Sequence, residues 1–416
     1  MIGPMFRFPA HAATFLLAAA SCACDAQVTV RGDTLVVDGR LFQARGAAGR
    51  THLDVLKALG ANTVRTYGDE TGQVLDDAAR LDLKVIAGVW LEPPRRGFDY
   101  RNRAAVEAQL KAIGDVVARY RGHPALLMWG VGNEVEGELV DDALVWPAIE
   151  EAARLVKSLD PAHPTMAVLA ESGGDKVRRL RERSPSIDVL GVNAYGEALL
   201  SLPDRVRAQG WTGPIVVSEL GALGQWQAGK TAWGAALEPS STEKAGALRR
   251  YMAAVAPGTA GHLVFLWGHK QEVTPTWHSL LLPSGEWTEA AEVMAGAWNG
   301  KTPGGNRAPR ITRLALDPAP VWRRSDSGRA ALDAHDPDSD AFAVEWSVMA
   351  ESTDLGKGGD AEARPADFAR AVRQVDTRGN RVTVAGLAAG SYRLFATVRD
   401  GKGAAATANV PFRIIE

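Results

Sequence analysis

The sequence predicts an α/β fold in which a closed barrel of parallel strands is followed by a smaller all-β domain. Two observations carry this expectation. Short hydrophobic runs alternate with helical stretches at a spacing of about 30 residues up to position 299, a pattern typical of repeated βα units. After a Pro- and Gly-rich stretch at residues 301–306, the runs become short and alternating, with turns between them, as in a β-sandwich.

Length and composition agree with two domains. The chain has 416 residues, which exceeds one ordinary domain and fits a barrel of about 250 residues plus a smaller module. Its 46% hydrophobic and 23% charged residues are typical of a soluble globular protein. Because the formal net charge is only −2, we expect no long-range attraction to nucleic acid and no nucleic-acid partner.

The first 26 residues have the pattern of a secretory signal. Arg7 precedes a small-residue apolar run at 12–20, which is too short to span a membrane, and a cleavage zone follows at 21–26. Both cysteines, Cys22 and Cys24, lie in that zone, and Ala20-Ser21-Cys22 resembles a lipoprotein cleavage box. We expect export to the periplasm, the medium or the outer membrane, with membrane attachment only through a lipid on Cys22. A disordered N-terminus without a role is the alternative.

Residues 27–300 are predicted to form the barrel. Residues 28–41 alternate in polarity and turn at Asp38-Gly39, which indicates a hairpin that could plug the barrel bottom. The expected barrel strands are 41–47, 62–66, 84–90, 125–131, 165–170, 187–192, 214–219 and 262–267. The expected helices are 54–59, 73–81, 103–120, 141–159, 172–183, 241–255 and 288–298. An open doubly wound sheet would need a glycine-rich phosphate loop after the first strand, and residues 45–49 match it poorly. We therefore predict a (β/α)8 TIM barrel.

Residues 301–306 are the expected linker, and residues 307–416 are predicted to form a small Ig-like β-sandwich. Its expected strands are 311–316, 341–349, 381–384, 392–398 and 406–414. The acidic turn Asp336-Pro337-Asp338-Ser339-Asp340 could ligate calcium, but it lacks the glycine and distal glutamate of an EF-hand loop, so a plain acidic turn is favoured. Since no aromatic row follows, we expect a spacer or packing role.

Two glutamates carry the functional prediction. Glu134 closes the hydrophobic run 126–131 in the string Trp129-Gly130-Val131-Gly132-Asn133-Glu134, and Glu219 closes Val216-Val217-Ser218-Glu219. The carboxyl ends of barrel strands are where TIM barrels build active sites. Two carboxylates on different strands, here the fourth and seventh, are what glycosidic bond cleavage through a covalent intermediate requires.

At this point the sequence resembles a known group. Residues 41–299 are similar to the clan of retaining glycoside hydrolases with glutamates after strands four and seven. The strings at 131–135 and 217–221 resemble families 17 and 72, which act on β-1,3-glucan, whereas residues 123–129 look more like family 2. Leu220 and Gly196 depart from the pattern of families 17 and 72, where tyrosine or serine and proline are frequent, so the clan is the firmer assignment.

The resemblance implies that Glu134 is the acid/base and Glu219 the nucleophile of a double displacement. The acid/base alternates between protonated and ionised forms, so its pKa has to lie near the working pH. The nucleophile has to stay ionised, which calls for hydrogen-bond donors nearby. A retaining pair should have carboxyl groups about 5–5.5 Å apart.

The same resemblance implies four substrate-binding positions. Arg65 and Tyr195 end strands two and six and are candidate donors near Glu219, and Asn133 would bind the sugar 2-hydroxyl. Trp267 would stack on an apolar sugar face. The structural alternatives are an ion pair of Arg65 with Asp69 and simple packing of Tyr195 and Trp267.

Other strand-end and loop residues remain as alternatives. Glu92 and Glu171 follow strands three and five and could replace either member of the chosen pair. Asn193 either binds sugar or satisfies the backbone. Loop tryptophans and histidines after strands seven and eight could line the cleft or pin the loops: Trp226, Trp233, Trp277, His269 and His278.

We therefore expect an exported retaining β-glycoside hydrolase or transglycosylase that acts on a β-glucan-type polysaccharide or oligosaccharide. This chemistry needs no metal or cofactor. Two alternatives stay open: a catalytically inactive carbohydrate-binding barrel, and an enzyme of the same clan with a mannoside, galactoside or glucuronide substrate.

Overall fold

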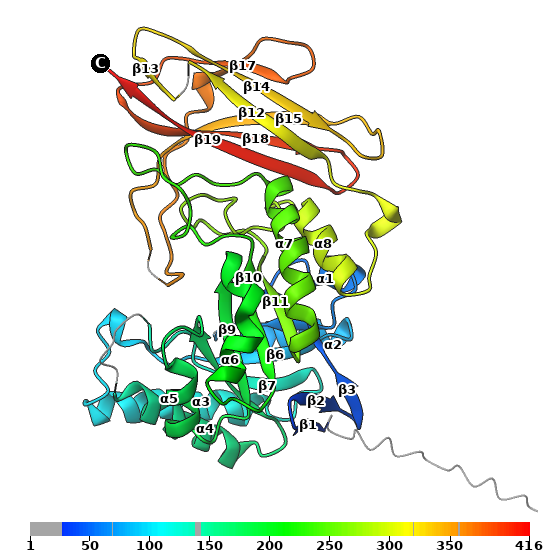
Figure 1. Ribbon diagram of the computed structural model, residues 1–416, viewed down its shortest axis with the longest axis vertical. Helices are drawn as coiled ribbons and strands as arrows, with labels where there is room; N and C mark the ends of the chain where they lie inside the picture. The colour runs from blue at the N-terminus through cyan, green and yellow to red at the C-terminus, as the bar shows by residue number, and fades with distance from the viewer. Residues whose placement is uncertain (1–26, 69, 138–142, 319, 357) are drawn as a thin grey trace, which may run out of the picture.

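The structure is a computed structural model that describes residues 27–68, 70–137, 143–318, 320–356 and 358–416. The predicted signal segment with Cys22 lies outside the described residues. The predicted fold class is confirmed, because eight parallel strands close into a barrel and an all-β sandwich follows it. In Figure 1 the sandwich is stacked above the barrel.

All eight predicted barrel strands are present, with ends displaced by at most three residues. They are β4 (Ala44–Gly49), β5 (Thr63–Arg65), β6 (Lys84–Val89), β7 (Leu126–Val131), β8 (Thr165–Ala170), β9 (Val189–Tyr195), β10 (Ile215–Gly221) and β11 (Gly261–Trp267). Their order around the barrel is β10-β11-β4-β5-β6-β7-β8-β9. Every residue of β7, β9 and β10 is buried, since parallel strands face packed side chains on the inside and helices on the outside.

The helices cover the barrel between these strands. They are α1 (Leu53–Ala58), α2 (Thr71–Arg80), α3 (Arg103–Tyr120), α4 (Val145–Leu159), α5 (Lys176–Arg183), α6 (Leu202–Ala208), α7 (Ser241–Val255) and α8 (Glu289–Ala297). The predicted bounds of α3 and α7 are confirmed. The start of α4 differs from the prediction: the helix begins at Val145 rather than 141. Helix α6, which has only seven residues, was not predicted from the sequence.

A small sheet closes the bottom of the barrel. The predicted hairpin at Asp38-Gly39 joins β2 (Thr34–Val37) to β3 (Arg40–Phe42), and β1 (Val28–Arg31) adds a third strand beside β2. Val28 and Leu35 from this sheet share one apolar cluster with Ile86, Met128 and Leu263 of the barrel strands. The hairpin therefore acts as the expected plug, at the end opposite to the strand carboxyl ends.

The C-terminal part consists of two four-stranded sheets packed face to face. One sheet has the order β12-β14-β17-β16 and the other β13-β19-β18-β15. The strands are β12 (Arg310–Asp317), β13 (Val321–Arg323), β14 (Gly328–His335), β15 (Ala343–Ala350), β16 (Val372–Gln374), β17 (Arg381–Val384), β18 (Gly390–Arg399) and β19 (Ala405–Ile415). Five of them were predicted, and β13, β14 and β16 were missed. The domain limits at 300 and 307 and the Ig-like relationship stay predictions.

Buried polar contacts hold the sandwich directly on the barrel. Arg393 of β18 is 2% exposed, donates to the carbonyl of Ala236 at 2.8 Å and pairs with Glu351 at 2.6 Å. Asn409 of β19 donates to the carboxylate of Glu238 at 2.6 Å. Because buried charged groups need such partners, the two parts form one packed unit. This contact fits the packing role expected for the sandwich better than a free spacer.

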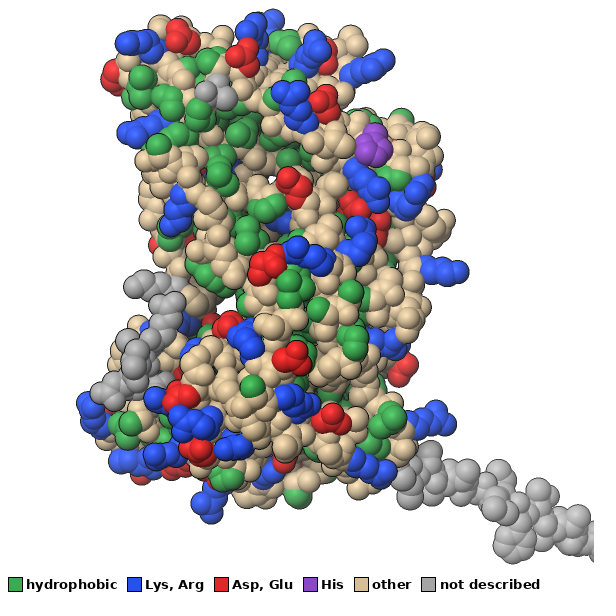
Figure 2. All heavy atoms as spheres, in the orientation of Figure 1, with side chains coloured by type: hydrophobic (Ala, Val, Ile, Leu, Met, Phe, Trp, Pro, Cys, Tyr) green, Lys and Arg blue, Asp and Glu red, His purple; other side chains and the backbone are tan. Residues whose placement is uncertain are grey.

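The surface is of mixed charge. On the face shown in Figure 2, lysine and arginine side chains are interspersed with aspartate and glutamate side chains. Among the described residues, no helix combines the length and the apolar character that crossing a bilayer demands.

Candidate active site

Glu134 lies on a tight turn directly after β7. Its backbone φ is +50°, which is the left-handed region, and its N–H donates to the carbonyl of Val168 at 3.0 Å. Gly132 also has a positive φ of +71°, and a Cβ there would meet the Val135 side chain at 2.5 Å, so the turn requires glycine. A non-glycine residue in this region costs free energy, and such strain concentrates at functional sites.

Glu219 is positioned by an irregularity in β10. The pairing of β10 with both neighbouring strands shifts register around Ser218 and Glu219, which marks a β-bulge. A bulge bends the strand and re-aims the side chains next to it. It also leaves the carbonyl of Ser218 available, and the guanidinium of Arg65 donates to that oxygen at 2.9 Å. The Glu219 side chain is only 8% exposed.

Three donors, at or just past the ends of two other strands, hold the Glu219 carboxylate. Arg65 at the end of β5 lies 3.1 Å from Oε1, and the Tyr67 hydroxyl donates to the same oxygen at 2.7 Å. Tyr195 at the end of β9 donates to Oε2 at 2.7 Å. Charge-assisted hydrogen bonds of this length favour a negatively charged carboxylate. The arrangement therefore suits a group that has to stay ionised.

Asn193 connects the two glutamates. Its Nδ2 donates to Glu134 Oε1 at 2.8 Å and to Asn133 Oδ1 at 3.1 Å. Its Oδ1 accepts hydrogen bonds from Ser218 Oγ at 2.8 Å and from Arg65 at 3.3 Å. Arg65 also donates to Asn133 at 2.6 Å. Both carboxylates therefore belong to one hydrogen-bonded network built from four strands.

Burial and the negative charge of Glu219 raise the pKa values of the side chains around it. Burial, and next the negative charge of Glu219, raise the pKa of Glu134 to about 7. Burial and the same charge raise the pKa of Tyr67 and of Tyr195 well above the usual value, so both hydroxyls stay protonated donors. A carboxyl with a pKa near neutrality beside a held carboxylate is the pattern of an acid/base and nucleophile pair.

The network lies at the bottom of a large cleft of about 1630 Å³. Its walls come from the loops after the barrel strands and also from the sandwich, which contributes residues from 350 to 392. Trp226, after β10, is 61% exposed and meets the ring of Tyr195 edge-on at 5.3 Å. It is therefore well placed as an aromatic surface for a ligand.

The structure brings Arg65, Asn133 and Tyr195 together with both glutamates. Arg65 and Tyr195 are 2% and 6% exposed, so they contact Glu219 and offer little surface to a substrate. The alternative partner of Arg65, Asp69, lies outside the described residues. Whether Asn133 binds a sugar 2-hydroxyl stays a prediction.

The stacking role expected of Trp267 needs correction. The side chain is 1% exposed, its indole N–H donates to the His52 carbonyl at 3.1 Å, and it packs against Trp298 with ring centroids 6.4 Å apart. Trp267 borders the cleft, but a side chain that is almost fully buried offers a sugar little surface for stacking. The structural alternative, packing at the top of the barrel, describes Trp267.

The alternative glutamates have other partners. Glu171 forms a two-pronged ion pair with Arg205, with both distances 2.8 Å. Glu92 lies 3.9 Å from Arg96. Each of these carboxylates is therefore engaged with a cation away from the Glu134–Glu219 network.

The sequence reading did not single out Tyr67. Its position two residues after Arg65, just past the end of β5, is a signal that could have found it. Of the loop residues, Trp277 is 2% exposed and donates to the Leu223 carbonyl at 2.9 Å, so it pins its loop. His278 contacts Gln225 and packs against Tyr195. Trp233 and His269 lie in the cleft wall.

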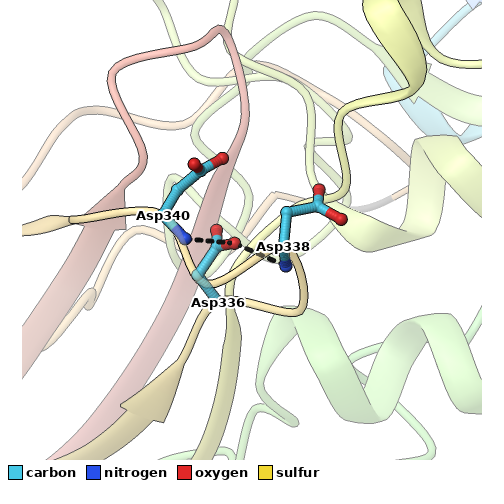
Figure 3. Close-up of side chains that lie close together, drawn as sticks. All are labelled: Asp336, Asp338 and Asp340. Carbon is cyan, nitrogen blue, oxygen red and sulfur yellow. Dashed lines mark hydrogen bonds between the residues drawn. The ribbon is translucent and has the colours of Figure 1, made fainter.

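The acidic turn of the sandwich is built mainly by its own backbone. One oxygen of Asp336 accepts hydrogen bonds from the N–H groups of Asp338 and Asp340 at 2.8 and 3.2 Å (Figure 3). Asp338 pairs with Arg307 and Asp340 with Lys402. These contacts agree with the acidic turn favoured by the sequence, although oxygens of the three carboxylates lie within 4.8 Å of one another.

Comparisons with known proteins find similarity to proteins that are named as β-glucuronidases and as a β-galactosidase. No protein-family model matches the chain. It is 27% identical over 186 residues to a β-glucuronidase of Homo sapiens, which covers 41% of this chain and 27% of that protein. It is 25% identical over 186 residues to the β-galactosidase BoGH2A of Bacteroides ovatus, which covers 36% of this chain and 21% of that protein.

Solved structures agree on the fold. The β-D-glucuronidase of Dictyoglomus thermophilum superposes with a TM-score of 0.53 at 18% identity, over 66% of this chain and 53% of that one. The chain spans about a quarter of the length of the curated relatives that it matches. The fold and the site thus define a (β/α)8 barrel with paired glutamates at its mouth, and the chain is similar to β-glucuronidases and β-galactosidases.

Proposed function

We propose that this protein is a retaining β-glycoside hydrolase in which Glu134 is the acid/base and Glu219 the nucleophile. The observation that carries the proposal is the single network that holds Glu219 with three donors while Glu134 has a pKa of about 7. The similarity to β-glucuronidases and a β-galactosidase supports the same reaction class.

The geometry suggests how the reaction proceeds. Glu219 attacks the anomeric carbon, the bond to the leaving oxygen breaks, and protonated Glu134 donates its proton to that oxygen. In the second half, Glu134 removes a proton from water, the water oxygen bonds to the anomeric carbon, and the ester to Glu219 breaks. Asn193 keeps Glu134 oriented in both halves. If a sugar hydroxyl takes the place of water, the result is transglycosylation.

For the substrate we propose a β-glucuronide rather than the β-glucan expected from the strings at 131–135 and 217–221. The human relative and the Dictyoglomus thermophilum structure are both named β-glucuronidases. None of the relatives reported above is named for a glucan. Lys230 in the cleft wall carries a positive charge that complements the sugar carboxylate. A β-galactoside is the second candidate, because of the similarity to the Bacteroides ovatus protein.

The test is turnover of a panel of nitrophenyl β-glycosides, with glucuronide, galactoside, mannoside and glucoside side by side. We expect fastest release from the glucuronide, and the β-anomer of the sugar as the first product by proton NMR. A 2-deoxy-2-fluoro glucuronide should add one glycosyl mass to the protein, located on Glu219.

The control is a pair of glutamate variants at the barrel mouth. Glu219→Gln should abolish turnover, whereas Glu171→Gln, which changes a carboxylate paired with Arg205, should retain it. Binding of sugars without turnover by the wild type would instead favour the inactive carbohydrate-binding barrel. An α-anomer as first product would contradict retention.

A further inference from the structure

A segment of the sandwich reaches into the candidate cleft. It connects β15 to the short turn η5 (Ala369–Ala371), and we call residues 351–356 and 358–367 the sandwich loop. In Figure 1 this orange segment descends from the sandwich toward the barrel. Leu355, Gly356, Gly358, Gly359 and Glu362 of this loop line the same cleft as the two glutamates.

On one side the sandwich loop is fixed to residues that follow β6. Asp360 pairs with Arg95 at 2.9 Å and accepts from Arg96 Nε at 3.0 Å. The carbonyl of Gly358 accepts from Arg95 at 3.1 Å. A Cβ on Gly358 would lie 2.9 Å from the Arg95 guanidinium carbon, so the loop backbone and the arginine are in close contact.

On the other side the loop is fixed to residues that follow β11. Lys270 donates to the carbonyl of Gly359 at 2.8 Å, and the N–H of Val273 donates to the carboxylate of Glu362 at 2.6 Å. In the barrel, β11 and β6 are separated by β4 and β5. The loop therefore links the segment after β11 to the segment after β6, and these two segments flank the ends of β4 and β5.

The positions of the two glutamates indicate on which side of a bound sugar the sandwich loop lies. In the proposed function, the leaving group has to lie beside Glu134, after β7, because Glu134 protonates its oxygen. The sugar that is attacked lies over Glu219, whose donors Arg65 and Tyr67 come from the end of β5. A second sugar on the non-reducing side would continue away from β7, toward the ends of β4 and β5, where the sandwich loop stands.

We propose that the sandwich loop is a wall of the sugar-binding site that admits a single glycosyl residue on the non-reducing side, so that the protein removes terminal residues only. This inference rests on the proposed function and extends it to the form of the substrate. The all-β module thereby determines substrate specificity through Asp360 and Glu362, which hold the wall in place, in addition to packing on the barrel.

The test compares a nitrophenyl β-monoside with the β-linked bioside of the same sugar. The wild type should release nitrophenol from the monoside at once, and from the bioside only after a lag in which the terminal monosaccharide appears. Chromatography of the early products should show monosaccharide without disaccharide. Disaccharide as an early product of the wild type would contradict the proposal that the sandwich loop is a wall. In that case, turnover of the monoside would still support the proposed function.

Two variants test whether the sandwich loop is the wall. In one, residues 355–361 are replaced by Gly-Ser. In the other, Asp360→Ala and Glu362→Ala are combined. This second variant keeps the chain length and serves as the test if the first variant does not fold. Both variants should release disaccharide directly from the bioside. The ratio of this rate to the rate on the monoside should exceed the wild-type ratio by about tenfold or more, as expected when a steric block is removed.

The matched control is Arg399→Ala, which breaks another ion pair between sandwich and barrel, to Glu286 at 3.1 Å, outside the cleft. It should keep the wild-type product pattern. Absence of disaccharide from both folded loop variants would overturn the proposal. If the wild type turns over neither substrate, the proposed function itself fails and this inference fails with it.

Discussion

The side-chain amide of Asn193 donates to Glu134 across 2.8 Å, and this contact joins the candidate acid/base to the residues that hold the nucleophile. Asn193 receives hydrogen bonds from Ser218 and Arg65 on its other side, so its amide is fixed with the nitrogen toward Glu134. This orientation lowers the pKa of Glu134 against the larger raising effects of burial and of Glu219. Asn193 therefore adjusts the pKa of Glu134 by stabilising its charged form.

The first prediction concerns the dependence of activity on pH. As the proposed acid/base, Glu134 has to be protonated to release a leaving group, and its pKa is about 7. We expect kcat/KM for a nitrophenyl β-glycoside to be high below neutrality and to fall as the pH rises through about 7. In Glu134→Gln this alkaline limb should disappear, and turnover of poor leaving groups should fall about 10²–10⁴-fold. An alkaline limb that persists in the variant would assign the titration to another group.

The second prediction concerns stability. The pKa of Glu134 is raised in the folded state, so folding favours its protonated form, and the stability this contributes is lost as the pH rises through about 7. Glu134→Gln cannot ionise, and we expect it to be more stable than the wild type at pH 8, by about 3 kcal/mol, with little difference at pH 4. Chemical unfolding at the two pH values measures this.

Glu171→Gln is the control for that experiment. Although burial raises the pKa of Glu171, the hydrogen bonds and charge of Arg205 dominate and lower it. A lowered pKa means stability that is present above the ordinary value and is lost on acidification. Glu171→Gln should therefore be less stable than the wild type at pH 8, the opposite direction to Glu134→Gln. The same direction for both variants would contradict the assignment.

The third prediction concerns the donors to Glu219. Tyr67→Phe removes one hydrogen bond of 2.7 Å to the carboxylate and leaves Arg65 on the same oxygen. A hydrogen bond to a charged group contributes about 1.5–3 kcal/mol, so we expect kcat to fall about 10–100-fold with the fold intact. Tyr100→Phe is the matched control, because its hydroxyl donates to the Glu92 carbonyl at 2.8 Å. Equal losses in both variants would mean that the effect on activity is general.

The fourth prediction concerns Trp226. Its exposed ring stands over Tyr195 in the cleft, and stacking on an aromatic ring contributes about 0.5–1.5 kcal/mol. Trp226→Ala should raise KM about 3–10-fold for substrates with an extended leaving group and leave kcat nearly unchanged. Trp277→Ala, which removes a buried loop pin, should instead lower the thermal unfolding temperature. An unchanged KM in Trp226→Ala would remove this residue from the binding surface.

Local patterns in the sequence predicted the parts of the site that sit on strand ends. The runs before Glu134 and Glu219 mark buried strands, and a carboxylate after such a strand has to lie at the barrel mouth. The bulge at Ser218–Glu219 was not predictable, because it depends on pairing with β9 and β11. The burial of Trp267 depends on Trp298, which comes from the segment after α8, and no local pattern reveals that contact.

The weaker elements were missed for a related reason. Helix α6 and strands β13 and β16 are short, so they carry little periodicity, and their conformation is set by what they pack against. In the sequence, the sandwich loop is more than 80 residues away from Lys270 and Val273, which it contacts in the fold. Its place over the cleft follows only from how the two parts are docked.

The docking of β19 on the barrel limits how the chain can be shortened. Asn409 donates to Glu238, and the backbone N–H of Thr407 donates to Ser241 at 2.9 Å. In a fragment that stops after α8, water would have to replace both donors. The backbone N–H of Trp287 would also lose the Gly403 carbonyl, to which it donates at 3.0 Å. Attempts to produce the barrel alone should therefore yield aggregates, and crystallisation should begin from a chain that runs through Glu416.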